Sequence, residues 1–190
     1  VSVALGGISG TNGWYISTVV VTPSANDSSS GIALLEAMVD GSSWFPINSP
    51  LSFSDGVHNF RFRATDNVGN VTETALQTIK VDTVTPKIST SISGSNGTIG
   101  WYVSNVTVSP VAQDAESGVA LLEIKIDNEE WVKAEEVHTF FEGVHNYQIR
   151  ATDIAGNITE SSIRTLKVDT ITPVINVSIK GVSGINGWYV

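Results

Sequence analysis

The sequence predicts an all-β protein built of tandem β-sandwich domains, and three observations lead to this prediction. The first is a repeat with a period of 87 residues, in which Trp14, Trp101 and Trp188 occupy the same "GWY" motif. The second is an alternation of apolar and polar residues with a period of two, which is typical of half-buried strands. The third is a turn signal about every 8 to 12 residues, without an apolar stripe of helical period.

The repeat predicts how the chain is divided. Residues 1–87 align with residues 88–174 without a gap, and nearly half of the aligned pairs are identical. A tandem period indicates an array of similar units, and a unit of this length can fold around its own core. We therefore expect one domain at 1–87, a second at 88–174 and the first strand of an incomplete third repeat at 175–190. Because Val1 directly follows a linker position of the repeat, we expect the segment to belong to a longer array.

Each copy contains five clear strand patterns in the same order. The opening "VSVAL" and the valine-rich "VVVTPSA" alternate in hydrophobicity, as does "ALLEAMVDG", which ends on the hairpin signal Asp40-Gly41. The longest pattern, "HNFRFRATD", places Phe60 and Phe62 on one face and Arg61 and Arg63 on the other. The turn "DNVGN" and the strand "TIKVD" complete the copy. About seven short strands in a unit of this length predict an immunoglobulin-like β-sandwich.

The inward positions of these strands predict the core. Large apolar side chains at these positions bury the most surface, so truncating one of them is expected to be costly. We expect the following residues to be buried, together with the residues 87 positions later: Val19, Val21, Leu35, Phe60, Phe62 and Val81.

Composition excludes several classes of function. The net charge is −9, which argues against nucleic acid and anionic membrane as partners because both attract basic surfaces. No apolar run is long enough to span a bilayer, so membrane insertion is not expected. There is no cysteine, which excludes disulfides and cysteine-based metal sites or nucleophiles. An acidic surface of this kind suits a soluble protein and attracts cations.

The motifs also resemble a known group of domains. Both copies carry, in order, "GWY", "D..SG", "GVHN(F/Y).(F/I)RATD..GN" and "VDT.TP". This string resembles the bacterial immunoglobulin-like repeats that occur in tandem in surface proteins and as accessory modules of secreted glycoside hydrolases. The resemblance implies an extracellular or cell-surface structural module, and by itself it implies no ligand.

Acidic residues in loops form the candidate metal site. In immunoglobulin-like connectivity, Asp114 and Asp153 lie in loops at one pole of the second copy. Asp82 leaves the opposite end of the first copy, and the short linker "DTVTP" brings it to the same junction. Three carboxylates at one place are oxygen ligands of the kind that Ca²⁺ takes. The alternative is that each aspartate bonds the backbone amides of its own turn.

Trp44 and Trp131 form the candidate ligand platform. They occupy equivalent places in the stretch where the copies differ most, residues 41–52 against 128–139. An exposed indole can stack on a sugar ring, whereas the alternative is packing, because large aromatic side chains dominate small cores. We favour packing for both residues.

No catalytic constellation is expected. His58 and His145 recur with the whole framework around them, and the sequence pairs no nucleophile with either of them. We therefore predict a non-catalytic, extracellular segment of a stalk, sheath or filament, whose partners are further copies of the same repeat. The alternative is a carbohydrate- or protein-binding accessory module of a secreted enzyme or adhesin.

Overall fold

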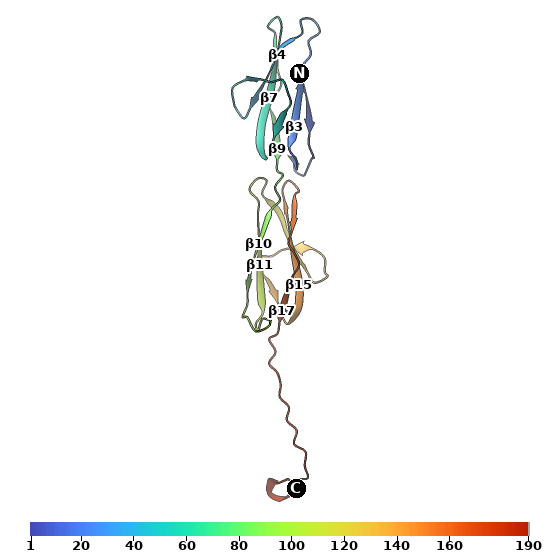
Figure 1. The fold of residues 1–190 in the computed structure, drawn as a ribbon, viewed down its shortest axis with the longest axis vertical. Helices are drawn as coiled ribbons and strands as arrows, with labels where there is room; N and C mark the ends of the chain where they lie inside the picture. The colour runs from blue at the N-terminus through green and yellow to red at the C-terminus, as the bar shows by residue number, and fades with distance from the viewer. Residues whose placement is uncertain (190) are drawn as a thin grey trace.

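The computed structural model describes residues 1–189, and every regular element within residues 1–168 is a β-strand. Figure 1 shows two elongated bodies stacked end to end, followed by an extended C-terminal segment. Each strand of residues 2–81 pairs with another strand of that range, and each strand of residues 87–168 pairs likewise within its own range. The chain therefore forms two successive sheet pairs, the first domain and the second domain.

The first domain consists of two facing sheets. The smaller sheet has the order β1 (Ser2–Gly6), β3 (Val19–Ser24) and β6 (Leu51–Phe53). The larger sheet has the order β2 (Trp14–Tyr15), β9 (Gln77–Val81), β7 (Gly56–Asp66), β4 (Ile32–Val39) and β5 (Phe45–Pro46), with β8 (Val71–Glu73) also on β7. All of these pairs are antiparallel except β2 with β9, where the N-terminal segment crosses from one sheet to the other.

The second domain repeats this topology. Its smaller sheet has the order β10 (Lys87–Ser93), β11 (Val106–Gln113) and β14 (His138–Phe140). Its larger sheet has the order β13 (Val132–Lys133), β12 (Val119–Ile126), β15 (Gly143–Asp153) and β16 (Ile158–Glu160), with β17 (Arg164–Val168) also on β15. A parallel bridge between Tyr102 and Val168 stands in the place of the pair β2 and β9.

This arrangement confirms the predicted fold class: both domains are immunoglobulin-like β-sandwiches. The turn chemistry works as expected in the first domain, where Asp40 and Gly41 adopt φ values of 49° and 74°. Two successive positive φ values form the hairpin turn that matches the twist of the flanking strands β4 and β5.

The core lies between the two sheets of each domain. Val19, Val21, Phe60, Phe62 and Val81 are all buried, as predicted. The prediction for Leu35 is wrong, because this residue is only half-buried and lines a surface cavity with Thr22 and Pro23. It is wrong for the equivalent Leu122 too, which is also half-buried. The equivalents of the confirmed residues are also buried, and they are Val106, Val108, Tyr147, Ile149 and Val168.

The segments outside the sheets differ in exposure. Residues 82–86 form an extended linker between the domains, and Pro86 within it is buried. Asp169 and Thr170 are still hydrogen-bonded to the second domain, through Tyr102 and Glu142. Residues 171–182 then run away from it without strand pairing in the described part of the chain, and a short 3-10 turn follows at Ile185–Gly187 (Figure 1). Across residues 1–189, no helix is long and apolar enough to cross a membrane.

Candidate functional site at the seam between the domains

The loop at residues 10–13 lies at the end of the first domain that faces the second domain, and it contacts that domain. Asn12 and Gly13 adopt φ values of 53° and 77°, a conformation that asparagine and glycine tolerate, and the loop therefore turns tightly. The backbone N–H of Thr11 donates to the carbonyl of Ala155 at 2.8 Å. The Thr11 hydroxyl and the Asn12 side-chain amide both donate to the carbonyl of Ile154, at 2.7 and 3.0 Å. We call the contact between the two domains the seam.

Close packing at the seam requires glycine at position 10. Ala155 is fully buried, and a Cβ atom on Gly10 would lie 2.2 Å from the Ala155 carbonyl oxygen. Real Cβ atoms essentially never approach another heavy atom below 3.0 Å, so any larger residue would force the two backbones apart. Glycine here permits the close approach of two chain segments.

The linker is bonded to the second domain as well. The Asp82 carbonyl accepts a hydrogen bond from the side-chain amide of Asn157 at 2.9 Å. The Asp82 carboxylate accepts one from the backbone N–H of Ser117 at 3.1 Å. Asp82 is fully buried, although it lies in a linker, because the second domain covers it.

The seam brings the three aspartates of the candidate metal site together. One carboxylate oxygen each of Asp82, Asp114 and Asp153 lies within 4.8 Å of the others. Each aspartate also caps its own turn, which is the bonding that the alternative interpretation expects. Asp82 accepts from the N–H of Val84 at 3.1 Å, Asp114 from Gly118 at 2.8 Å, and Asp153 from Gly156 and Asn157 at 2.6 and 2.8 Å.

The bonding leaves one carboxylate oxygen without a partner. Oδ2 of Asp114 is inaccessible to solvent and accepts no hydrogen bond from the described residues. Among those residues, none of the three carboxylates forms an ion pair within 4.0 Å. Crowded carboxylates without a counter-charge repel one another, so this cluster would be stabilised by a cation.

The dimensions suit a calcium ion. Ca²⁺ binds oxygen at about 2.3–2.6 Å, so ligands on opposite sides of the ion stand about 5 Å apart, close to the spread of these oxygens. A cavity of about 530 Å³ opens beside Asp114, but neither Asp82 nor Asp153 lines it. The cavity is lined by Val84, Thr85, Lys87, Ala112, Gln113, Asp114, Ala115 and Val119.

Trp44 and Trp131 lie on the outer face of the larger sheets and are half-buried there rather than in the core. The guanidinium carbon of Arg63 lies 4.5 Å from the ring centre of Trp44, and Arg63 also pairs with Glu36 at 2.8 Å. Arg150 stands at the same 4.5 Å over Trp131. Both indoles are therefore covered on one face by an arginine, in a cation–π contact.

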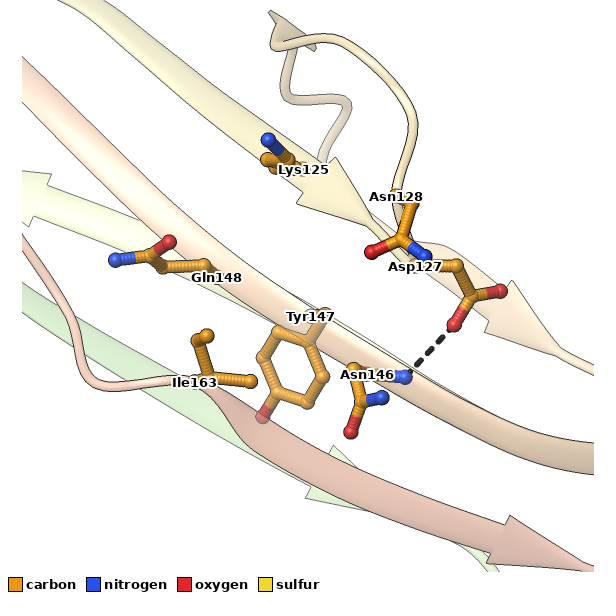
Figure 2. Close-up of a pocket in the computed structure, with 7 residues that line it drawn as sticks. All are labelled: Lys125, Asp127, Asn128, Asn146, Tyr147, Gln148 and Ile163. Carbon is orange, nitrogen blue, oxygen red and sulfur yellow. Dashed lines mark hydrogen bonds between the residues drawn. The ribbon is translucent and has the colours of Figure 1, made fainter.

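Figure 2 shows a separate pocket of about 220 Å³ in the second domain. Its acidic residue, Asp127, accepts a hydrogen bond from the backbone N–H of Asn146 at 2.8 Å (Figure 2). The carboxylate of Asp127 also lies 3.1 Å from Nδ1 of His145, so both of its oxygens are bonded within the second domain. The pocket is smaller than the 300–1,000 Å³ that small-molecule sites usually occupy. Its lining residues are Lys125, Asp127, Asn128, Asn146, Tyr147, Gln148 and Ile163.

Sequence reasoning missed the loop that forms the seam. In the sequence, the turn at residues 10–12 resembles the other repeated turns. Ala155 likewise looks like an ordinary turn residue of "DIAGN". A signal was present in the comparison of the copies, since the position of Ala155 holds the larger Val68 in the first domain.

Comparisons with known proteins show a similarity in structure but none in sequence family. No protein-family model matches the chain, and a comparison with curated proteins gives no match. Among solved structures, the chain is similar to fibronectin(III)-like modules of CbhA from Clostridium thermocellum, with 15% identity and a TM-score of 0.35. That alignment covers 88% of this chain and 93% of the other.

Proposed function

We propose that this chain is a structural, non-catalytic segment of an extracellular tandem-repeat protein, in which successive β-sandwiches are held end to end as a stiff stalk, sheath or filament. The seam is the observation that carries the proposal. Hydrogen bonds run across it from the loop of Thr11 and from the linker at Asp82, and Gly10 lies against Ala155. Domains of one chain move relative to each other unless their interface holds them, so bonds of this kind favour a mechanical role.

The rod shape is tested by small-angle scattering from the 190-residue chain. A stiff joint predicts one dominant distance between the two domain centres, at an end-to-end arrangement. A broad distribution of that distance, with bent and extended forms together, would overturn the mechanical reading.

We further propose that Asp82, Asp114 and Asp153 bind Ca²⁺ at the seam. The ion would neutralise carboxylates that otherwise repel, and it would tie a linker residue to two loops of the next domain. Calcium would then stiffen the joint and raise its stability together.

Thermal melts with calcium and with chelator test this proposal. Calcium at a hundredfold excess over Kd should stabilise the folded chain by about 2.7 kcal/mol. Asp114→Asn retains the oxygen that caps Gly118 but removes the charge, so it should abolish the calcium effect and, in chelator, melt no lower than the parent chain. Glu130→Gln removes an exposed charge elsewhere and should leave the calcium effect unchanged. Equal melting temperatures with calcium and with chelator would contradict the proposed calcium site.

The alternative role is a carbohydrate- or protein-binding module with Trp44 and Trp131 as its platform. Arg63 and Arg150 occupy one face of each indole, which reduces the surface available for stacking on a sugar. A glycan array with the 190-residue chain and with Trp44→Ala and Trp131→Ala variants distinguishes the two roles. Binding that both variants lose would favour the alternative.

A further inference from the structure

Asparagine is followed directly by glycine at Asn12, Asn96 and Asn186. Glycine has no Cβ to obstruct its backbone nitrogen, so that nitrogen can attack the Cγ atom of the preceding asparagine. The nitrogen loses its proton as it bonds to Cγ, the bond from Cγ to Nδ2 breaks, and ammonia leaves with that proton. Water then opens the resulting succinimide ring to aspartate or isoaspartate. Each Asn-Gly pair is therefore a labile position whose rate depends on its surroundings.

Two of these pairs lie in the same kind of turn. The Asn12-Gly13 pair has φ values of 53° and 77°, and the Asn186-Gly187 pair has φ values of 62° and 79°. In each turn a glycine N–H donates to the carbonyl of the tryptophan four residues later, at 2.9 Å from Gly10 and 2.6 Å from Gly184. Both asparagines are exposed, so water reaches each of them. The local turn therefore treats the two asparagines alike.

The seam distinguishes them, because it holds the side chain of Asn12. Nδ2 of Asn12 donates to the carbonyl of Ile154 in the second domain at 3.0 Å. The hydroxyl of Thr11 donates to the same carbonyl at 2.7 Å, which fixes the loop beside the asparagine. Within residues 1–189, the side chain of Asn186 forms no hydrogen bond. The amide of Asn12 must leave Ile154 before its Cγ can turn to the Gly13 nitrogen, so the closed seam opposes the reaction.

Both products of the reaction oppose closure of the seam. Aspartate at position 12 has no side-chain N–H, so it would face the carbonyl of Ile154 as a second acceptor. It would also bring a negative charge next to Asp153, one of three carboxylates that already lie together at the seam. Isoaspartate lengthens the backbone by one atom beside Gly10, where even an added Cβ would lie 2.2 Å from the carbonyl oxygen of Ala155.

We propose that Asn12 is a modification site, at which opening of the seam permits deamidation and deamidation then keeps the seam open. The inference rests on the proposed function, because a stalk under load strains its joints and a strained joint opens more often. While the seam is closed, the bond to Ile154 preserves the amide. Each opening exposes it to the Gly13 nitrogen, and hydrolysis is not reversed. The joint therefore converts repeated opening into a permanent gain in flexibility.

Peptide mass spectrometry of the 190-residue chain, incubated at mildly alkaline pH, follows deamidation at Asn12 and Asn186 separately. Three hydrogen bonds close the seam over the loop of Asn12, so this residue should react about tenfold to a thousandfold more slowly than Asn186. Gly10→Ala opens the seam and should bring the rate at Asn12 to that at Asn186. Gly97→Ala, the equivalent change away from the seam, should leave Asn12 as slow as in the parent chain. Equal rates at Asn12 and Asn186 in the parent chain would overturn the proposal.

Hydrogen exchange at the Thr11 amide tests whether the product keeps the seam open. Asn12→Asp reproduces one product and should accelerate this exchange by about tenfold or more. Asn12→Gly tolerates the same positive φ and removes the donor without adding a charge, so it should accelerate the exchange less. Residue 12 is exposed, and circular dichroism checks that both variants fold. An Asn12→Asp chain whose Thr11 amide exchanges as slowly as that of the parent would overturn the proposal.

The Thr11 amide of the parent chain separates this inference from the proposed function. An amide without protection would mean that the seam is open, so the stiff joint would fail and the modification site with it. A protected amide that Asn12→Asp leaves protected would remove the modification site while the stiff joint stands.

Discussion

Replacing Gly10 with alanine should open the seam. The new Cβ would lie 2.2 Å from the carbonyl oxygen of Ala155, which is a backbone atom and cannot rotate away. The loop must therefore withdraw, and three hydrogen bonds made by Thr11 and Asn12 are lost or lengthened. Each such bond contributes about 0.5–1.5 kcal/mol net, so the free energy that holds the seam closed should fall by roughly 1.5–4.5 kcal/mol.

The repeat supplies a matched control in Gly97→Ala. In both variants the new Cβ meets a side-chain methyl of its own domain, 2.7 Å from Ile16 in one case and 2.8 Å from Val103 in the other. Only the Cβ atom at position 10 also contacts the neighbouring domain, at the carbonyl oxygen of Ala155. The difference between the two variants therefore isolates the seam from the local cost of the substitution.

Hydrogen exchange at the Thr11 amide measures the effect, because this N–H is bonded to Ala155 across the seam. The loss above corresponds to exchange faster by about tenfold to a thousandfold in Gly10→Ala. Gly97→Ala should leave the Thr11 amide unchanged. Equal exchange of that amide in the parent chain and Gly10→Ala would refute the reasoning, since the loop would then move at no cost.

Three further predictions concern the individual domains. Phe60→Ala should destabilise the first domain by about 3–5 kcal/mol in urea unfolding, because Phe60 is fully buried; a loss below about 1 kcal/mol would contradict its place in the core. Tyr147→Phe should stabilise the second domain by about 1 kcal/mol, since the buried hydroxyl bonds none of the described residues; a loss of stability would mean that the hydroxyl is paired. The Asp40 carboxylate raises the pKa of His58 above 6.5, and hydrogen bonding, first of all to His58, lowers the pKa of Asp40 below 3.8. The stability from this pair is therefore full between about pH 4 and 6.5, is lost as pH rises through the raised pKa of His58, and is lost again as pH falls through the lowered pKa of Asp40. Unfolding of His58→Gln across the upper range should lack that part of the pH dependence.

The sequence by itself determined the strands, the turns and most of the core. Alternation is a local property, so Phe60 and Phe62 could be placed inward from "HNFRFRATD" alone, and Asp40-Gly41 could be placed in a hairpin turn from its own backbone preferences. The repeat then extended each assignment to the second domain. The place of Trp44 could not be predicted in this way, because no local pattern distinguishes packing in the core from packing under Arg63 on the outer face of the sheet.

Only the tertiary structure decided how the two domains meet. Chain direction was enough to predict that Asp82, Asp114 and Asp153 lie near one junction, since an end and a pole must face each other in a tandem array. The contact between Gly10 and Ala155 depends on how one domain is rotated relative to the next. That rotation is set by the fit of backbone against backbone across residues far apart in sequence, and no local pattern encodes it.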